Sequence, residues 1–385
     1  MSTPTDPRPH SAAALRVAVL GGGAGGLSCA VELTQRGHRV RLWNRNPATV
    51  QAFSAGVIPH AGVLGEGSVQ VEAVTSDLAD ALAGADVAMV CLPALAHGPL
   101  FAELAELACA LPVVLNPGHT GAALHLLHVF SVRGMPPPPI AELSTLTYVA
   151  RRHGDQVRIT GRAGQVRCGA LPGGAAAAQA AAALFGEVIA PVPDVLASSL
   201  ANVNLVLHPP GAILAAAWTE STAGAFTFYV DAMTPGVGRV IDTLDAERRA
   251  VAAAYGHDLP PLTQEMALIG TVPPELAQTA HTAAAIRSGQ ANQSIAAPAS
   301  LQHRYYQEDF PYAIRPFQAL ARIAAVPTPL ADALATVATA LLGPAIVVNG
   351  LDAEKLGLTG LDQDGVQKLV RVRDVAGLAW EGVCE

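Results

Sequence analysis

The chain has 385 residues, of which 51% are hydrophobic and 14% are charged, and this composition predicts two packed domains. The formal net charge of -8 disfavours a nucleic-acid partner, which would need a basic surface. The apolar stretches are rich in alanine and interrupted by Gly, Pro or charges, so we expect no membrane span. The five cysteines have no Cys-x-x-Cys spacing and favour a cytoplasmic protein without a bound metal.

The predicted organisation has three parts. Residues 1–14 contain Pro4, Pro7 and Pro9 and are interpreted as a disordered leader rather than a signal peptide. Residues 15–192 are expected to form a dinucleotide-binding Rossmann domain with a parallel sheet, and residues 193–385 a helical domain that carries substrate and catalytic groups. The boundary is placed at Pro191-Val-Pro193, where the composition changes.

A glycine-rich loop follows the first predicted strand. The strand is Arg16–Leu20, the loop is Gly21–Gly26, and an alanine- and leucine-rich helix continues to about Arg36 before a second strand at Arg39–Trp43. A lone Gly-x-Gly-x-x-Gly is weak evidence, but this one follows a strand, opens a helix and lies in a βαβ unit. The alternative is a glycine-rich turn without a ligand.

Each glycine of the loop has a physical role in dinucleotide binding. Gly21 permits a tight turn, Gly23 lets the backbone approach a pyrophosphate, and Gly26 allows close packing of the helix. With Ala24 they form the predicted cofactor loop, because the helix N-terminus presents free N–H groups to the anion.

The second strand ends in Asn44 and Arg45, where NAD-binding proteins usually place an acidic residue for the ribose hydroxyls. A neutral residue followed by a cation favours a 2′-phosphate, so NADP(H) is predicted over NAD(H). Stacking of Arg45 on the adenine of NAD is the alternative.

Two further strands, predicted at Val87–Leu92 and Pro112–Leu115, end near Pro93 and Asn116. Ligands bind beyond the carboxyl ends of parallel strands, so Pro93, Asn116, Gly118 and His119 are candidates for the nicotinamide side of the cleft. Farther along, residues 156–169 resemble a β-hairpin, and Glu142 either faces the cofactor or lies on the surface.

The second half is predicted to be helical. Apolar residues at helical spacing over residues 195–207 indicate a helix, and His208-Pro-Pro is expected to end it. Asn204 lies one turn before His208 on the same face. His208 would then sit at a helix C-terminus, where the dipole favours its protonated form, and a capping or core histidine is the alternative.

Lysine occurs only at Lys355 and Lys368, so the middle of the chain cannot supply a catalytic lysine or a P-loop lysine. A dehydrogenase similar to ketopantoate reductase or glycerol-3-phosphate dehydrogenase generally relies on such a residue in its second domain. This absence disfavours that alternative. A non-catalytic NADP-binding protein is the other alternative.

Several separated segments recur together in one known family. They are Asn204–Pro209, Gly224–Tyr229, Ile241–Arg248, Ala297–Leu301 and Arg304–Pro311. With these segments the chain resembles the opine dehydrogenase family, which includes octopine and nopaline dehydrogenases, from Arg16 to about Gly360. The resemblance implies a Rossmann domain followed by an all-helical domain. It also implies NAD(P)H-dependent condensation of an α-keto acid, such as pyruvate, with the amino group of an amino acid.

The same resemblance gives roles to four residues. His208 and Asp309 match the family's catalytic dyad, Asn204 its substrate-contacting asparagine, and Arg304 its substrate-carboxylate arginine. These residue types suit imine reduction, which needs a proton relay and a fork-shaped cation for a carboxylate. A structural salt bridge is the alternative for Arg304, and a helix N-cap for Asp309. The apolar helices of the second domain would also suit a homodimer.

Overall fold

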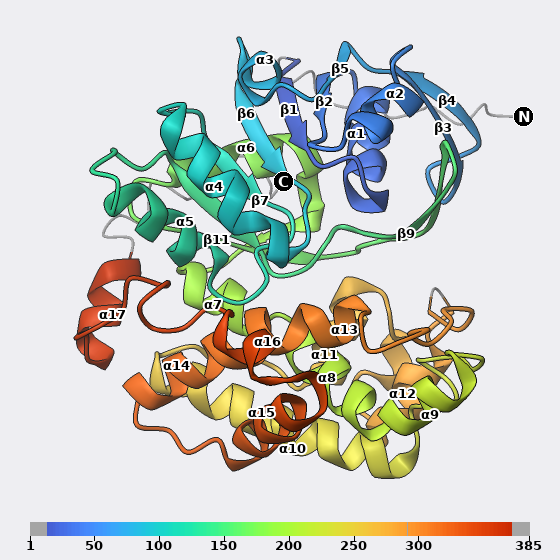
Figure 1. Cartoon of the computed structure of the whole chain (residues 1–385), viewed down its shortest axis with the longest axis vertical. Helices are drawn as coiled ribbons and strands as arrows, with labels where there is room; N and C mark the ends of the chain where they lie inside the picture. The colour runs from blue at the N-terminus through green and yellow to red at the C-terminus, as the bar shows by residue number, and fades with distance from the viewer. Residues whose placement is uncertain (1–13, 291, 372–385) are drawn as a thin grey trace, which may run out of the picture.

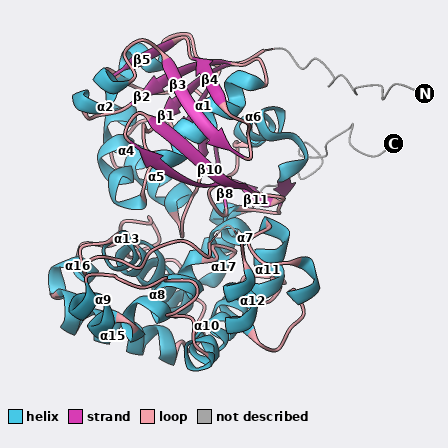
Figure 2. Cartoon of the chain, turned by 90° about the vertical axis from the view of Figure 1, so that its right-hand side faces the viewer, coloured by secondary structure: helices cyan, strands magenta, loops and turns pink. Residues whose placement is uncertain are grey.

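The computed structural model describes residues 14–290 and 292–371, so the predicted leader lies almost entirely outside the described residues. The chain is α/β followed by all-α: the strands gather in one half of the molecule and the helices after residue 191 in the other (Figures 1 and 2). Helix α7 (Val195–Leu200) lies where the two halves meet (Figure 1). The predicted fold class is confirmed.

The larger sheet has eight strands in the order β12-β11-β8-β7-β6-β1-β2-β5. Only the pair β8 and β11 is antiparallel, so β11 and β12 run against the other strands. The carboxyl ends of β1, β6 and β7 therefore lie side by side, and their loops meet at one edge. The strands are β1 (Arg16–Leu20), β2 (Arg39–Trp43), β5 (Ala73–Thr75), β6 (Val87–Val90), β7 (Val113–Leu115), β8 (Ile140–Leu143), β11 (Val166–Ala170) and β12 (Ile189–Pro191).

A second sheet of four strands has the order β4-β3-β10-β9. Its strands are β3 (Val57–Gly62), β4 (Gly67–Gln70), β9 (Tyr148–His153) and β10 (Gln156–Arg162). The hairpin predicted over residues 156–169 is wrong, because β10 pairs with β9 and β3 while β11 joins the larger sheet. Strand partners far apart in sequence cannot be identified from local composition.

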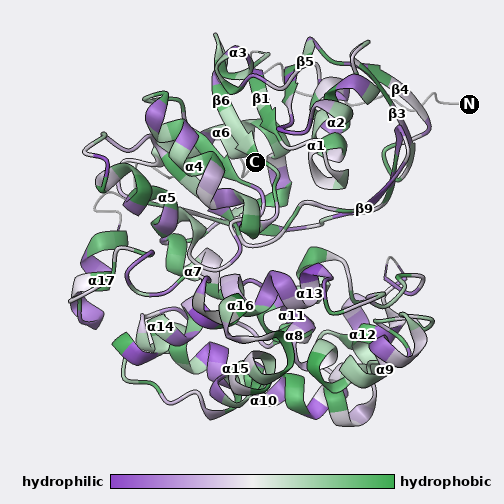
Figure 3. Ribbon diagram, in the orientation of Figure 1, coloured by the Kyte–Doolittle hydropathy of each residue, from purple (hydrophilic) through white to green (hydrophobic). Residues whose placement is uncertain are grey.

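Helix α1 (Ala24–Gln35) packs against strands of both sheets, and every residue from Gly26 to Leu33 is buried. The other helices of this half are α2 (Pro47–Ala52), α3 (Leu78–Leu82), α4 (His97–Glu106), α5 (Ala122–Ser131) and α6 (Ala175–Phe185), with 3₁₀ turns η1 (Ala94–Ala96) and η2 (Gly186–Val188). The central strands β1, β6 and β7 are almost wholly apolar and buried, and Figure 3 shows the hydrophobic colour along β6. They form the core that fixes the loop edge.

The second half is built from helices α7 to α17. Beyond α7 they are α8 (Asn204–Leu214), α9 (Ala216–Thr222), α10 (Pro235–Ala254), α11 (Leu262–Ile269), α12 (Thr282–Ser288), α13 (Arg304–Gln307), α14 (Arg315–Ile323), α15 (Pro329–Leu342), α16 (Pro344–Val348) and α17 (Gln363–Val370), with a 3₁₀ turn η3 (Pro274–Leu276) and a π-helical turn η4 (Phe310–Ile314). Among the described helices, none alone is long and apolar enough to cross a membrane; only residues 195–214 and 216–222 taken together, bent by 61°, meet that test.

The helix predicted over residues 195–207 is wrong in both its continuity and its end. Helix α7 ends at Leu200. Asn202 Oδ1 then accepts the backbone N–H of Asn204, where the next helix begins. That helix, α8, then runs through Pro209 and Pro210 to Leu214. His208 therefore lies inside a helix, and the expected dipole effect at a C-terminus does not apply.

Candidate active site

The glycine loop connects β1 to α1, and its glycines are required for two different reasons. A Cβ on Gly21, at φ 134°, would lie 2.4 Å from Cys91 O, and one on Gly26 would lie 1.7 Å from Gly21 O. A Cβ on Gly23 would meet nothing within 4 Å. Gly21 and Gly26 thus allow the chain to pack, whereas Gly23 keeps open space in front of the helix N-terminus. This is the cradle that a pyrophosphate requires.

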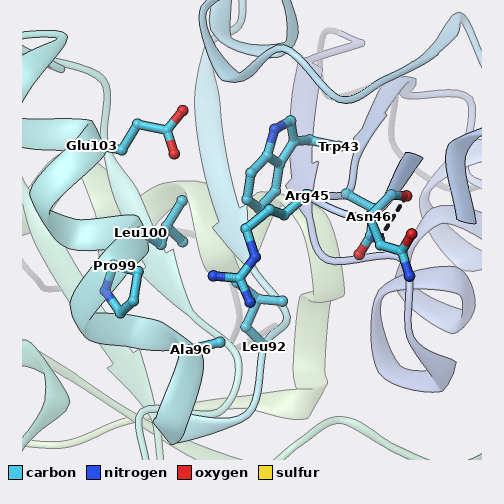
Figure 4. Close-up of a pocket in the computed structure, with 9 residues that line it drawn as sticks. Trp43, Arg45, Asn46, Leu92, Ala96, Pro99, Leu100 and Glu103 are labelled. Atoms are coloured by element: carbon cyan, nitrogen blue, oxygen red, sulfur yellow. Dashed lines mark hydrogen bonds between the residues drawn. The ribbon is translucent and has the colours of Figure 1, made fainter. Parts of the chain in front are cut away.

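The end of β2 forms the wall of a small pocket beside this loop. Asn44 Oδ1 accepts the backbone N–H of Gly22 at 3.0 Å, so Asn44 fixes the loop. Arg45 extends across a pocket of about 150 Å³ towards Leu92 and the start of α4, with Glu103 on the far wall (Figure 4). The arrangement suits the adenosine end of a dinucleotide and brings the Arg45 guanidinium to it.

Two adjacent arginines on β9 serve different surfaces. Arg152 Nη1 donates to Gly22 O at 3.3 Å, and its guanidinium lies 5.0 Å from the centre of the Phe53 ring. Its neighbour Arg151 lines a different and larger cavity, which lies between the two halves. Neighbouring side chains on a strand point to opposite faces, which explains the division. Neither arginine was singled out by the sequence reasoning.

A cavity of about 420 Å³ lies between the two halves and is lined by residues from both. Gly23, Ala24 and Pro93 line it from the sheet half, and Asn204, His208 and Arg304 from the helical half. These predicted site residues therefore meet at one space, although the two groups are about 100 to 280 positions apart in the chain.

His208 is held at both ring nitrogens. Asp309 Oδ2 lies 2.8 Å from Nδ1, and the Tyr229 hydroxyl lies 2.8 Å from Nε2. Tyr305 stacks on the imidazole with ring centres 4.0 Å apart, and its hydroxyl lies 3.1 Å from that of Tyr229. All four side chains are buried, and Asp309 forms no side-chain capping bond with the turn that follows it. An ionised Asp309 accepts from Nδ1–H, which leaves Nε2 as an acceptor in the neutral ring.

Glu308, adjacent to Asp309, joins the two halves of the site. Its Oε1 accepts the backbone N–H of Ala94 at 2.7 Å and lies 3.2 Å from His119 Nε2. Its Oε2 lies 2.8 Å from Arg304 Nε. Burial raises the pKa of this carboxyl, but His119, Arg304 and the Ala94 N–H together bring the pKa below its ordinary value. Arg304 remains 45% exposed and so keeps room for a ligand.

Asn116, predicted to contact the nicotinamide, has both ends of its amide engaged with Thr147. Its Nδ2 donates to Thr147 Oγ1 at 3.0 Å, and its Oδ1 accepts Thr147 N–H at 3.2 Å. Of the same loop, Pro117 and the predicted candidate His119 line the cavity.

Glu142 is buried, so the surface alternative for this residue is wrong. Its carboxylate accepts from Ser198 Oγ at 3.0 Å, from Ser199 Oγ, and from the backbone N–H of Ala123 at 3.0 Å. Burial raises its pKa to about 7, despite these donors. Glu142 thus joins β8 and α5 to helix α7.

Comparison with known proteins decides the family. Residues 191–342 match the model of the NAD/NADP octopine/nopaline dehydrogenase alpha-helical domain, and residues 16–116 that of the NAD-dependent glycerol-3-phosphate dehydrogenase N-terminus. An opine dehydrogenase of Arthrobacter sp. (strain 1C) is 32% identical over 360 residues, which are 92% of this chain and 98% of the relative. The chain belongs to the opine dehydrogenase family. It is an NAD(P)-dependent dehydrogenase.

Solved structures share the fold of this opine dehydrogenase family member. Octopine dehydrogenase with NADH and L-arginine superposes with a TM-score of 0.71 at 20% identity, covering 92% of this chain and 98% of the other. Yersinopine dehydrogenase with NADP⁺ gives 0.68 at 16% identity, covering 92% and 97%. One of these structures holds NADH and the other NADP⁺, so this fold is compatible with both cofactors.

Sequence reasoning missed Tyr229, Tyr305 and Glu308 as members of the site. The contacts of the two tyrosines with His208 are non-local, so no short sequence pattern indicates them. Glu308 did carry a local signal. It stands four residues after Arg304, the spacing at which helical side chains of opposite charge meet.

Proposed function

We propose that the protein catalyses the reductive condensation of an α-keto acid with the amino group of an amino acid, giving an N-(carboxyalkyl) amino acid. The observation that supports this most strongly is the buried His208–Asp309 pair, whose histidine lines the same cavity as the glycine loop. A carboxylate-oriented histidine is suited to move a proton at neutral pH. When bound, the dinucleotide supplies the hydride that reduces the imine carbon.

The proposed roles follow the chemistry of each side chain. His208 is the acid/base group, Asp309 sets its tautomer and stabilises the imidazolium, and Asn204 contacts the substrate. Arg304 binds the keto acid carboxylate with its planar fork. The product has two carboxylates, and the cavity is lined by two arginines, Arg304 and Arg151, which matches that charge pattern.

We also propose that NADPH is the preferred reductant. The support is Arg45 at the adenosine pocket together with the uncharged Asn44 at the end of β2. Arg45→Ser should then lower the ratio of kcat/KM for NADPH to that for NADH by about tenfold or more. Arg39→Ser, at the other end of the same strand and paired with Glu72, is the matched control. A ratio unchanged by Arg45→Ser would favour the stacking alternative.

The substrate class is tested by following NADPH oxidation with pyruvate or other keto acids and a mixture of amino acids. Oxidation that requires both partners, with the coupled product identified by its mass, is the expected result. Oxidation with a keto acid alone would favour a keto acid reductase instead. The residues that line the cavity include neither Lys355 nor Lys368, which disfavours the lysine-dependent version of that reaction.

Two further expectations accompany the function. The domain boundary at residues 192/193 is supported by the end of the last strand at Pro191 and the start of α7 at Val195. The homodimer and the cytoplasmic location stay predictions, and sedimentation of the purified protein tests the first.

A further inference from the structure

The His208 imidazole has no ring nitrogen left for a substrate. Nδ1 faces Asp309 and Nε2 faces Tyr229, each at 2.8 Å. The ring also cannot turn easily, because Tyr305 stacks on one face at 4.0 Å and Phe228 lies edge-on at 6.0 Å between ring centres. A proton that reaches or leaves His208 in this arrangement passes through the group on Nε2.

That group is the Tyr229 hydroxyl. Its hydrogen-bond directions follow from the tautomer: Tyr229 donates to the unprotonated Nε2 and accepts from Tyr305. Tyr229 lines the cavity together with His208, so the group hydrogen-bonded to Nε2 belongs to a residue of the cavity wall. Burial raises the pKa of this hydroxyl well above its usual range, which disfavours a free tyrosinate and favours passing a proton on in one step.

We infer that Tyr229 is a catalytic residue of this enzyme. Its hydroxyl exchanges protons with the substrate and passes them to and from His208. The inference rests on the proposed function and identifies the end of its proton path. Tyr305 is a positioning residue that fixes the Tyr229 oxygen and the plane of the imidazole.

The proton transfers balance over imine formation. The substrate ammonium gives one proton to the Tyr229 oxygen as Tyr229 passes its own proton to His208 Nε2, and Asp309 stabilises the imidazolium. The freed amine attacks the keto carbon, and a proton moves from nitrogen to oxygen to give the carbinolamine. The same two transfers in reverse then protonate its hydroxyl. The C–O bond breaks with its electron pair on oxygen, water leaves, and the protonated imine remains with both residues restored.

The central test is Tyr229→Phe, which keeps the ring and removes only the oxygen. We expect kcat to fall about 100-fold, the usual size of a lost general acid/base, with the KM of the keto acid and the Kd of NADPH within about threefold of wild type. The solvent deuterium isotope effect on kcat should also be smaller than in wild type, because fewer protons move together in the transition state. A kcat above about one third of wild type would overturn the inference.

Matched controls separate this effect from the general loss of a buried hydroxyl. Tyr255 donates its hydroxyl to Leu320 O at 2.9 Å within the helical half, so Tyr255→Phe removes a comparable bond away from the cavity. It should leave kcat unchanged, and an equal loss of kcat in both variants would contradict the relay. Tyr305→Phe keeps the stacked ring and should lower kcat only about threefold to tenfold, since the relay atoms remain.

A second replacement keeps the test decisive if Tyr229→Phe does not fold. Difluorotyrosine at position 229 retains the hydroxyl and makes it more acidic, so both kcat and its solvent isotope effect should differ from those of wild type. Values of both that equal those of wild type would overturn the inference. Failure of the proposed function is recognised separately, because amine dependence is measured on wild type. Reduction of a keto acid alone also needs a proton at oxygen, so the ratio of variant to wild type still tests Tyr229.

Discussion

The glycine loop and the cluster around His208 face one cavity but are built in opposite ways. The loop is six consecutive residues that act through backbone and through missing side chains, as Gly23 shows. The cluster is made of buried side chains from positions 208, 229, 305 and 309, each held by another. Under the proposed function, cofactor binding depends on local geometry and the chemistry depends on a tertiary network. Variants in the two regions should fail differently.

The largest expected effect lies in the cluster. His208→Ala should lower kcat by about 10³-fold or more, because Asp309 and Tyr229 lose the group through which they act. The Kd for NADPH, measured by fluorescence titration, should stay within about threefold of wild type, since the cradle belongs to the other half. His281→Ala, at an exposed histidine, is the control. Weakened cofactor binding in His208→Ala would point to a structural role instead.

A pair of glycine variants separates folding from binding within the loop. Gly23→Ala should raise the Kd for NADPH at least about tenfold without a change in Tm, because its Cβ would occupy only the open cradle. Gly26→Ala should also destabilise the fold, by about 1–3 kcal/mol or more, because its Cβ would overlap Gly21 O. Thermal unfolding and cofactor titration of both variants check this. Equal losses of stability would remove the distinction between the two glycines.

Arg304→Lys should have a smaller effect that is confined to one substrate. A point charge replaces the fork, so the KM for the keto acid should rise about tenfold while kcat changes little. Steady-state kinetics with the amine held at saturation provide the measurement. An unchanged KM would remove Arg304 from the carboxylate site, and Arg151→Lys, assayed alongside, shows whether the other arginine of the cavity holds that carboxylate.

The smallest effect on turnover is expected at Glu142, where stability changes instead. Its carboxyl has a pKa of about 7 in the folded protein against an ordinary 4.5, so the folded state holds the proton more tightly. The stability this provides is complete below pH 4.5 and is lost as the pH rises to about 7, on the order of 3 kcal/mol. Glu142→Gln should flatten this dependence in urea unfolding at pH 5 and pH 8. Exposed Glu187→Gln should not.

The contrast between the two regions also explains how much of the fold and of the site could be predicted from the sequence. The glycine loop could be predicted because a strand, six loop residues and a helix follow one another directly in the sequence. The pairing of His208 with Asp309 was predicted from the family resemblance alone, because no local pattern links two residues that are 101 positions apart. Tyr229 was missed for the same reason. The break at Asn202 was missed because a side chain that caps its own backbone leaves no periodic pattern.

The structure of strand β9 limits which mutations this part of the site tolerates. Arg151 lines the cavity and Arg152 donates to Gly22 O of the glycine loop, because side chains alternate between the two faces of the strand. The turn at Gly154 and Asp155 fixes the register of β9 against β10. A single residue inserted between Arg152 and this turn would move each guanidinium to the opposite face of the strand. This strand therefore accepts substitutions far more readily than changes of length.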